Sequence, residues 1–266
     1  MEGIKAFLGR PIPFKDICNI YPPLVDDIID NPNFFSQLNH FTIAQEDIWD
    51  GMNQERINED PYAEWERPKE FLTPFTRLIA AYSTNPTLRL EIVNGFQIFT
   101  KHEFIYLSSL KGFLMINDPI KEYLDKNSDF NDLEAEDIKI IDNNNFLDFQ
   151  NAIRAAVGQK SKVNPDLDEH PRIARMKALR RIRDARKGQY NKIDITTTLS
   201  SVCCMGVGIT PLNIGKVTYA SINRILKAYQ QKEDYEQRTL SASVGMLDTK
   251  KHKIKHWIRD PEVEDD

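Results

Sequence analysis

The stretch that decides the fold class is residues 96–116, FQIFTKHEFIYLSSLKGFLMI, which is rich in aromatic and β-branched side chains. Polar residues interrupt it at Lys101–His102 and at Ser108–Lys111, as turns do between strands. The stretch therefore predicts two or three short strands. Because amphipathic helical patterns come before and after it, we expect an α+β fold, with a mixed N-terminal lobe of a few short strands and a mainly helical C-terminal part.

Two proline signals place helices just before these strands. Asn85–Pro86 starts one helix, and we expect Gly95 to close it, because glycine commonly follows the end of a helix. Thr73–Pro74 fits the N-cap and first helical position of an earlier helix. The apolar residues of that earlier helix recur at helical spacing and predict a buried stripe made of Phe75, Leu78, Ile79 and Tyr82.

The N-terminal segment is expected to begin in an extended form. Residues 11–23 contain four prolines around a short apolar run and predict a strand-like entry. Residues 24–30 predict a short helix. Thr42 is expected to cap a further helix over residues 43–57, with Gln45 completing a capping box.

The pattern after the strands returns to helix. Residues 138–142, IKIID, predict one more strand. Asn143–Asn145 then provide caps for a helix whose predicted buried stripe is Phe146, Phe149, Ile153 and Val157. Two more helices are predicted, from about Asp194 to Met205 and from Val217 onward.

The composition is that of a globular protein. Of the 266 residues, 41% are hydrophobic and 28% are charged. Nothing approaches eighteen apolar residues in a row, so no membrane span is expected. The cysteines number three and two of them are adjacent, which fits a reducing compartment better than a disulfide framework.

Charge divides the chain unevenly. Residues 1–170 contain 16 Lys/Arg and 29 Asp/Glu, residues 171–192 contain 9 and 1, and residues 193–266 contain 10 of each. Residues 158–171 hold Gly158, Pro165 and Pro171 and almost nothing to bury. We therefore expect an acidic α+β lobe over residues 1–157, a linker over 158–171, and a helical region over 172–266 that begins with a basic helix.

The basic helix is the candidate interaction element. Residues 171–187, PRIARMKALRRIRDARK, carry eight cations and one anion. A narrow apolar strip of Ile173, Met176, Ala178, Leu179, Ile182 and Ala185 predicts that the helix also docks. Attraction to the acidic lobe, within one chain or between subunits, is the simplest account of its charge. The expected interaction face consists of Arg172, Arg175, Arg180, Arg181, Arg183, Arg186 and Lys187.

Three segments resemble catalytic or metal-binding motifs, but each departs from what its motif requires. Residues 125–136 place oxygen side chains at EF-hand positions, but Phe130 stands where the sharp turn requires glycine. Gly215–Lys216 lacks the earlier glycine and the following Ser/Thr of a phosphate-binding loop. His252 and His256 are one helical turn apart among lysines, which repel a metal ion. We expect no enzyme activity, no metal and no cofactor.

Nucleic-acid binding through the basic helix 172–187 is the alternative function. Such a site usually adds neighbouring aromatic residues or a known reading module, and only Tyr190 is near. The connection between the two predicted C-terminal helices is also too long for a helix-turn-helix. Nucleic acid is therefore the less expected partner.

The order of features resembles a family of bacteriophage proteins encoded beside the tail-tube and tape-measure genes, regarded as tail assembly chaperones. The resemblance covers nearly the whole chain. It rests on LGRPIPFKDICNIYPPLVDDIIDNPNFFSQLNHFTIAQEDIW (residues 8–49), FLDFQNAIRAAVGQ (146–159), RIARMKALRRIRDARK (172–187) and KIKHWIRD (253–260). Its most specific piece is GITPLNIGKVTYASINRILKAY (208–229), where similar proteins carry a Leu-Asn-Ile/Val run before a Tyr-rich helix.

The resemblance implies a non-catalytic assembly factor that acts in the host cytoplasm. Its implied partner is the phage tape-measure protein or the tail-tube protein, which it would hold soluble while the tail forms. Self-association into a homo-oligomer and retention in the virion are left open by the sequence. No site residue is carried over from the family.

Overall fold

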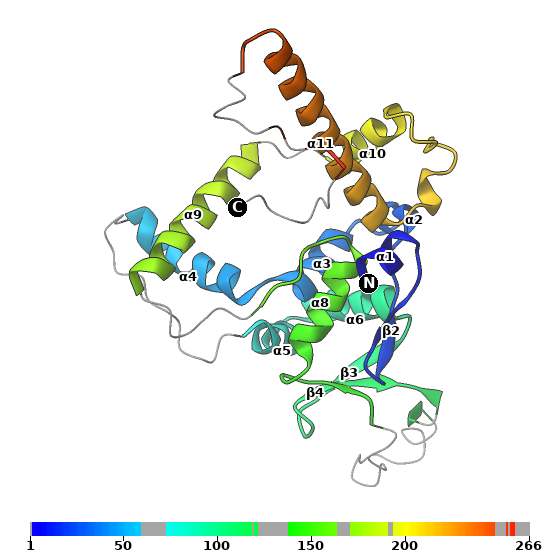
Figure 1. Ribbon diagram of the computed structural model, residues 1–266. Helices are drawn as coiled ribbons and strands as arrows, with labels where there is room; N and C mark the ends of the chain where they lie inside the picture. The colour runs from blue at the N-terminus through cyan, green and yellow to red at the C-terminus, as the bar shows by residue number, and fades with distance from the viewer. Residues whose placement is uncertain are drawn as a thin grey trace.

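A computed structural model shows the α+β fold that the sequence predicts (Figure 1). It describes residues 2–59, 73–118, 120–121, 138–163, 171–190, 194–247, 254 and 256–258. The EF-hand-like residues 125–136 and His252 lie outside the described residues, as does half of the predicted linker, residues 164–170. The helices and strands in chain order are α1 (Glu2–Phe7), β1 (Ile12–Phe14), β2 (Cys18–Ile20), α2 (Val25–Ile29), α3 (Phe34–Thr42), α4 (Gln45–Glu59), α5 (Pro74–Thr84), α6 (Pro86–Thr100), β3 (Glu103–Leu107), β4 (Gly112–Ile116), β5 (Ile140–Ile141), α8 (Phe146–Ala156), α9 (Pro171–Tyr190), α10 (Ile195–Cys204), the short 3₁₀ helix η1 (Ile214–Lys216) and α11 (Tyr219–Ser243).

Two small antiparallel sheets confirm the predicted strand regions. β1 and β2 form a hairpin in the proline-rich entry, with Ile12 opposite Ile20. β3, β4 and β5 form the second sheet in that order, with Phe104 opposite Met115 and Phe113 opposite Ile141. Every residue of β4 is buried, so this sheet forms one wall of the core.

The core is built mainly from phenylalanine rings. Phe96 lies near its centre: its ring centroid is 4.5 Å from that of Phe104 in a stacked arrangement and 4.8 Å from that of Phe41 in an edge-on one. The stripe predicted on α8 is buried throughout, as expected. The fully buried phenylalanines are Phe34, Phe41, Phe96, Phe99, Phe104, Phe113, Phe146 and Phe149.

The prediction that Gly95 closes its helix is wrong. α6 continues through residues 96–100, which the sequence pattern had assigned to a strand, and ends before Lys101, whose φ is +62°. Gly95 serves packing instead, because a Cβ there would stand 2.4 Å from Cε2 of Phe41. The close approach of two helices, rather than a helix end, requires glycine at this position.

The predicted caps are partly confirmed. Thr73 accepts a hydrogen bond from the Thr76 amide at 3.1 Å, and Asn85 accepts one from Thr87 at 2.9 Å, as predicted. The Thr42 cap is wrong, because Thr42 is the last residue of α3 and its hydroxyl donates to the Leu38 carbonyl. The helix α3 was not expected from the sequence, and it ends at the residue where a new helix was expected to begin.

The first turn of α11 is fastened to the N-terminal elements. The Thr218 hydroxyl donates to the Ala6 carbonyl at 3.1 Å, and the Ser221 hydroxyl donates to the Phe7 carbonyl at 2.7 Å. The Asn223 amide donates to the Val157 carbonyl at the end of α8. These bonds satisfy carbonyls at the C-terminal ends of α1 and α8 and fix where α11 leaves the core. None of the described helices is long and apolar enough to span a membrane.

Replacing Gly95 by alanine tests this packing. We expect Gly95→Ala to lower the free energy of unfolding by about 1–3 kcal/mol, because the new methyl group overlaps the buried Phe41 ring. Gly51→Ala is the matched control, since a Cβ at this helical glycine of α4 meets nothing within 4 Å. It should be neutral or stabilise by about 0.5–1 kcal/mol. Urea unfolding of both variants checks the sign, and an equally mild Gly95→Ala would contradict the account.

Candidate interaction surfaces

Arg181 links the basic helix to the acidic lobe. The Arg181 guanidinium of α9 donates to the Asp50 carboxylate of α4 through Nε at 2.7 Å and through Nη2 at 2.9 Å. Its Nη1 also lies 3.3 Å from Oε1 of Glu46, one turn earlier on α4. This bidentate geometry is the strong form of the arginine–carboxylate pair, and it sets the rotation of α9 about its axis.

The ion pair between Arg181 and Asp50 is partly buried, so it differs from an exposed surface ion pair. The side chain of Asp50 is 11% exposed and that of Arg181 is 29% exposed. Hydrogen bonds to Asp50 raise the pKa of Arg181 above its usual range, although partial burial acts in the opposite direction. Arg181 therefore stays charged at any physiological pH. Removing either partner would leave a charge with little access to water.

Side chains of α8 position the start of α4. The Gln150 amide donates to the Ile43 carbonyl at 3.0 Å, and the Arg154 guanidinium donates to the Thr42 carbonyl. Both carbonyls lie in the turn between α3 and α4, where the end of a helix leaves acceptors unsatisfied. Burial lowers the pKa of Arg154, and Asp47 partly offsets this. The core helix α8 thus fixes the start of α4, and α4 holds α9.

The apolar strip predicted on α9 divides between two faces. Ala178 is fully buried on the side that faces α4. Ile173, Met176 and Leu179 are 49%, 72% and 37% exposed, so they do not dock on this chain as the sequence suggested. Small side chains let α9 approach α4, and the larger apolar side chains point outward. The outer face is thus an exposed line of Ile173, Met176 and Leu179 among cations.

The predicted interaction residues are not all on that outer face. Arg172, Arg180 and Arg183 are exposed, and Arg175 is partly exposed. Arg181 instead faces the lobe, paired with Asp50. The side chains of Arg186 and Lys187 lie outside the described residues. The role of these residues in binding a partner stays a prediction.

A second surface is an apolar groove between α2, the start of α3, and α10. It has a volume of about 760 Å³ and is lined by side chains that carry no charge. Ile29 and Phe35 line it from one side while being 57% and 46% exposed, and Leu199 and Cys204 line it from α10. Clefts of this size and character bind apolar side chains or ligands.

The elements that form the groove carry more acidic than basic residues. α2 and its C-cap contribute Asp26, Asp27 and Asp30, and α10 begins at its N-cap Asp194. The amide and the hydroxyl of Thr197 donate to Asp194 and lower its pKa. On the elements that line the groove, Lys216 of η1 is the basic residue opposing these four carboxylates.

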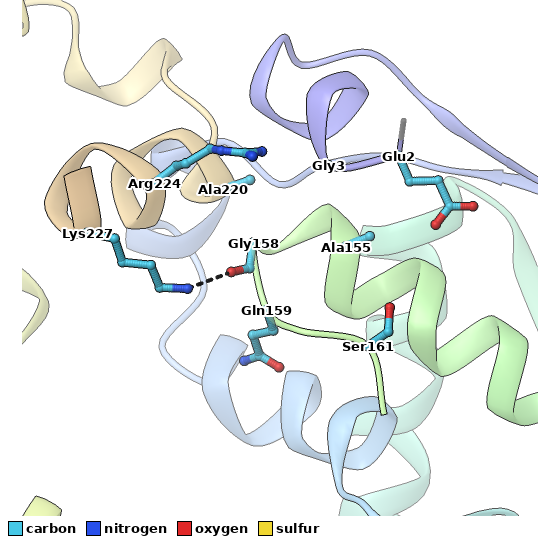
Figure 2. Close-up of a pocket in the computed structure, with 9 residues that line it drawn as sticks. All are labelled: Glu2, Gly3, Ala155, Gly158, Gln159, Ser161, Ala220, Arg224 and Lys227. Atoms are coloured by element: carbon cyan, nitrogen blue, oxygen red, sulfur yellow. Dashed lines mark hydrogen bonds between the residues drawn. The ribbon is translucent and has the colours of Figure 1, made fainter. Parts of the chain in front are cut away.

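A smaller polar pocket lies where α1, the end of α8, and α11 meet (Figure 2). Its volume is about 230 Å³, and Glu2, Arg224 and Lys227 bring both signs of charge to it. Figure 2 shows the Lys227 amine directed at the Gly158 carbonyl, 3.5 Å away. Gly158 has a φ of +73°, and a Cβ there would press on the α11 backbone at Ala220. The pocket is thus part of the packing between α1, α8 and α11.

Within the described residues, no group of three or more His, Cys, Asp or Glu side chains is placed to hold a metal ion. Glu46 and Asp50 were not singled out from the sequence, although their i, i+4 spacing places them on one face of α4. The groove was missed as well. Its signal is the run of residues 195–215, which contains no charged side chain.

Comparison with known proteins gives a family match for the C-terminal part of the chain. Residues 186–262 match the model of a family described as the YomV second domain, a phage-derived family named after a protein of a Bacillus prophage. The match covers less than a third of the chain and includes α10 and α11. It is consistent with a phage protein. Neither the curated proteins nor the solved structures gave a significant match.

Replacing Arg181 by alanine tests the link between α9 and α4. We expect amide hydrogen exchange in α9 to speed up and stability to fall by about 1–3 kcal/mol, because the mostly buried carboxyl group of Asp50 loses its hydrogen-bonding partner. The control is Arg238→Ala on α11, whose pair with Asp234 is half exposed. That change should cost less than about 0.5 kcal/mol. Equal exchange of α9 in the two variants would show that the Arg181 contact does not hold the helix.

Proposed function

We propose that this protein is a non-catalytic phage tail assembly factor that binds the tape-measure or tail-tube protein during tail formation. The observation that carries the proposal is the outer face of α9. It is a helix fixed on one side by Arg181 that exposes Ile173, Met176 and Leu179 on the other. The match of residues 186–262 to a phage-derived family and the resemblance to tail assembly chaperones support the same reading.

The chemistry of the outer face indicates what it would bind. Side chains three residues apart lie on neighbouring positions of a helix, so Ile173, Met176 and Leu179 can pack against one apolar stripe of a partner helix. The surrounding arginines favour acidic residues on either side of that stripe. Methionine suits a chaperone, because its flexible thioether adapts to partners of different shape. An acidic amphipathic helix is therefore the partner segment of best fit.

Nucleic acid is the alternative partner, because α9 carries eight cations and one anion between residues 171 and 187. A duplex would be held by its phosphates, and its affinity would fall steeply with salt. The position of Met176 favours the protein partner. This side chain is 72% exposed in the middle of the cationic face, where it adds nothing to a phosphate contact.

Co-expression with the tail proteins tests the proposal. We expect the chain to increase the soluble fraction of the tape-measure or tail-tube protein and to co-purify with it. Met176→Glu should weaken this binding by about tenfold or more, because it places a charge in the apolar line. Met246→Glu is the matched control, since Met246 is 84% exposed outside α9 and should leave binding unchanged.

Titration with duplex DNA at two salt concentrations separates the two partners. The proposal predicts weak binding to DNA, beside salt-tolerant binding to the tail protein. Unchanged solubility of both tail proteins, together with a steep salt dependence of DNA binding, would contradict the proposal and favour the alternative.

A further inference from the structure

The chain has two exposed apolar features that it does not bring together. One is the outer face of α9, formed by Ile173, Met176 and Leu179, and the other is the groove between α2, α3 and α10. Figure 1 shows α9 beside α4 on one side of the molecule, while α10 and α2 lie on the other. Since α9 is held to α4 by Arg181, it does not reach the groove of its own chain.

The two features are complementary in charge. The outer face of α9 lies among cations, with eight of them and one anion between residues 171 and 187. The elements around the groove carry the carboxylates of Asp26, Asp27, Asp30 and Asp194 against the amine of Lys216. A helix rich in cations and a groove whose elements carry mainly carboxylates attract each other before contact, whereas two copies of the same face repel each other.

The dimensions agree as well. Ile173 and Leu179 are six residues apart, so the strip extends about 9 Å along the helix axis. A groove of about 760 Å³ has room for the three side chains of such a strip. Its lining of Ile29, Phe35 and Leu199 is apolar, as the side chains of the strip are.

We infer that α9 of one copy docks in the groove of a second copy, with Met176 pointing toward α10. Each copy then uses two different surfaces, so the contact is either reciprocal, in a two-fold dimer, or continues head-to-tail into a ring or an open chain. The contact also covers the apolar face of α9 when no tail protein is present. This inference concerns a second copy of the chain and does not depend on which tail protein the factor binds.

The native cysteines provide a direct test. Cys204 is exposed and Cys203 is partly exposed, and both line the groove. Burial raises the pKa of Cys18 to about 12, so that thiol reacts slowly. In the full chain, Met176→Cys treated with copper–phenanthroline should form an intermolecular disulfide to Cys203 or Cys204. Peptide mass spectrometry identifies the joined positions, and Ser at residues 203 and 204 should abolish the product.

Lys177→Cys is the matched control. Lys177 is also exposed on α9, but it lies about 100° around the helix from Met176. We expect the disulfide yield to the groove cysteines to be about tenfold lower from this position than from residue 176, because only residue 176 docks in the groove. Equal products from the two positions, or a disulfide that joins the two new thiols of Met176→Cys, would overturn the inference.

Sedimentation provides a second, independent measurement. The native chain should associate as its concentration rises, and Ile29→Arg should weaken this association by about tenfold or more. Ile29 is 57% exposed, so this change in the groove spares the core. A native chain that stays monomeric up to about 0.5 mM, a concentration at which even weak specific contacts form, would overturn the inference even if the tail protein binds.

Discussion

The bidentate ion pair between Arg181 and Asp50 is the constraint on which the interaction surface depends. It turns one side of α9 toward α4 and thereby leaves Met176 on the opposite side. Because Asp50 is mostly buried, the pair cannot be exchanged for contacts with water at little cost. A cationic helix that would otherwise be free to bind any anion is thus held in one orientation.

The helix that carries Asp50, α4, is held in place by the aromatic core. α8 buries Phe146 and Phe149 there, and from the same helix Gln150 and Arg154 hold the turn that starts α4. Core packing therefore decides where Asp50 lies. α11 depends on the core in a similar way, since its first turn caps the end of α1. The starts of α4 and α11 are thus both set by hydrogen bonds to carbonyls at or next to helix ends.

Features that depend on neighbouring residues could be predicted from the sequence, and features that depend on distant ones could not. The Thr73 and Asn85 caps act over two or three residues, and both were predicted correctly. Gly95 was misassigned because its role is set by Phe41, far away in the chain. The basic helix could be predicted, but its partner on α4 and the division of its apolar strip follow from tertiary packing.

Radical footprinting of the methionines tests the central claim most directly. Met176 and Met246 are both largely exposed in the dilute monomer and should oxidise at similar rates. In the complex with the tape-measure or tail-tube protein, the account predicts that oxidation of Met176 falls several-fold while that of Met246 is unchanged. Oxidation of Met176 at its unbound rate within a stable complex would contradict it.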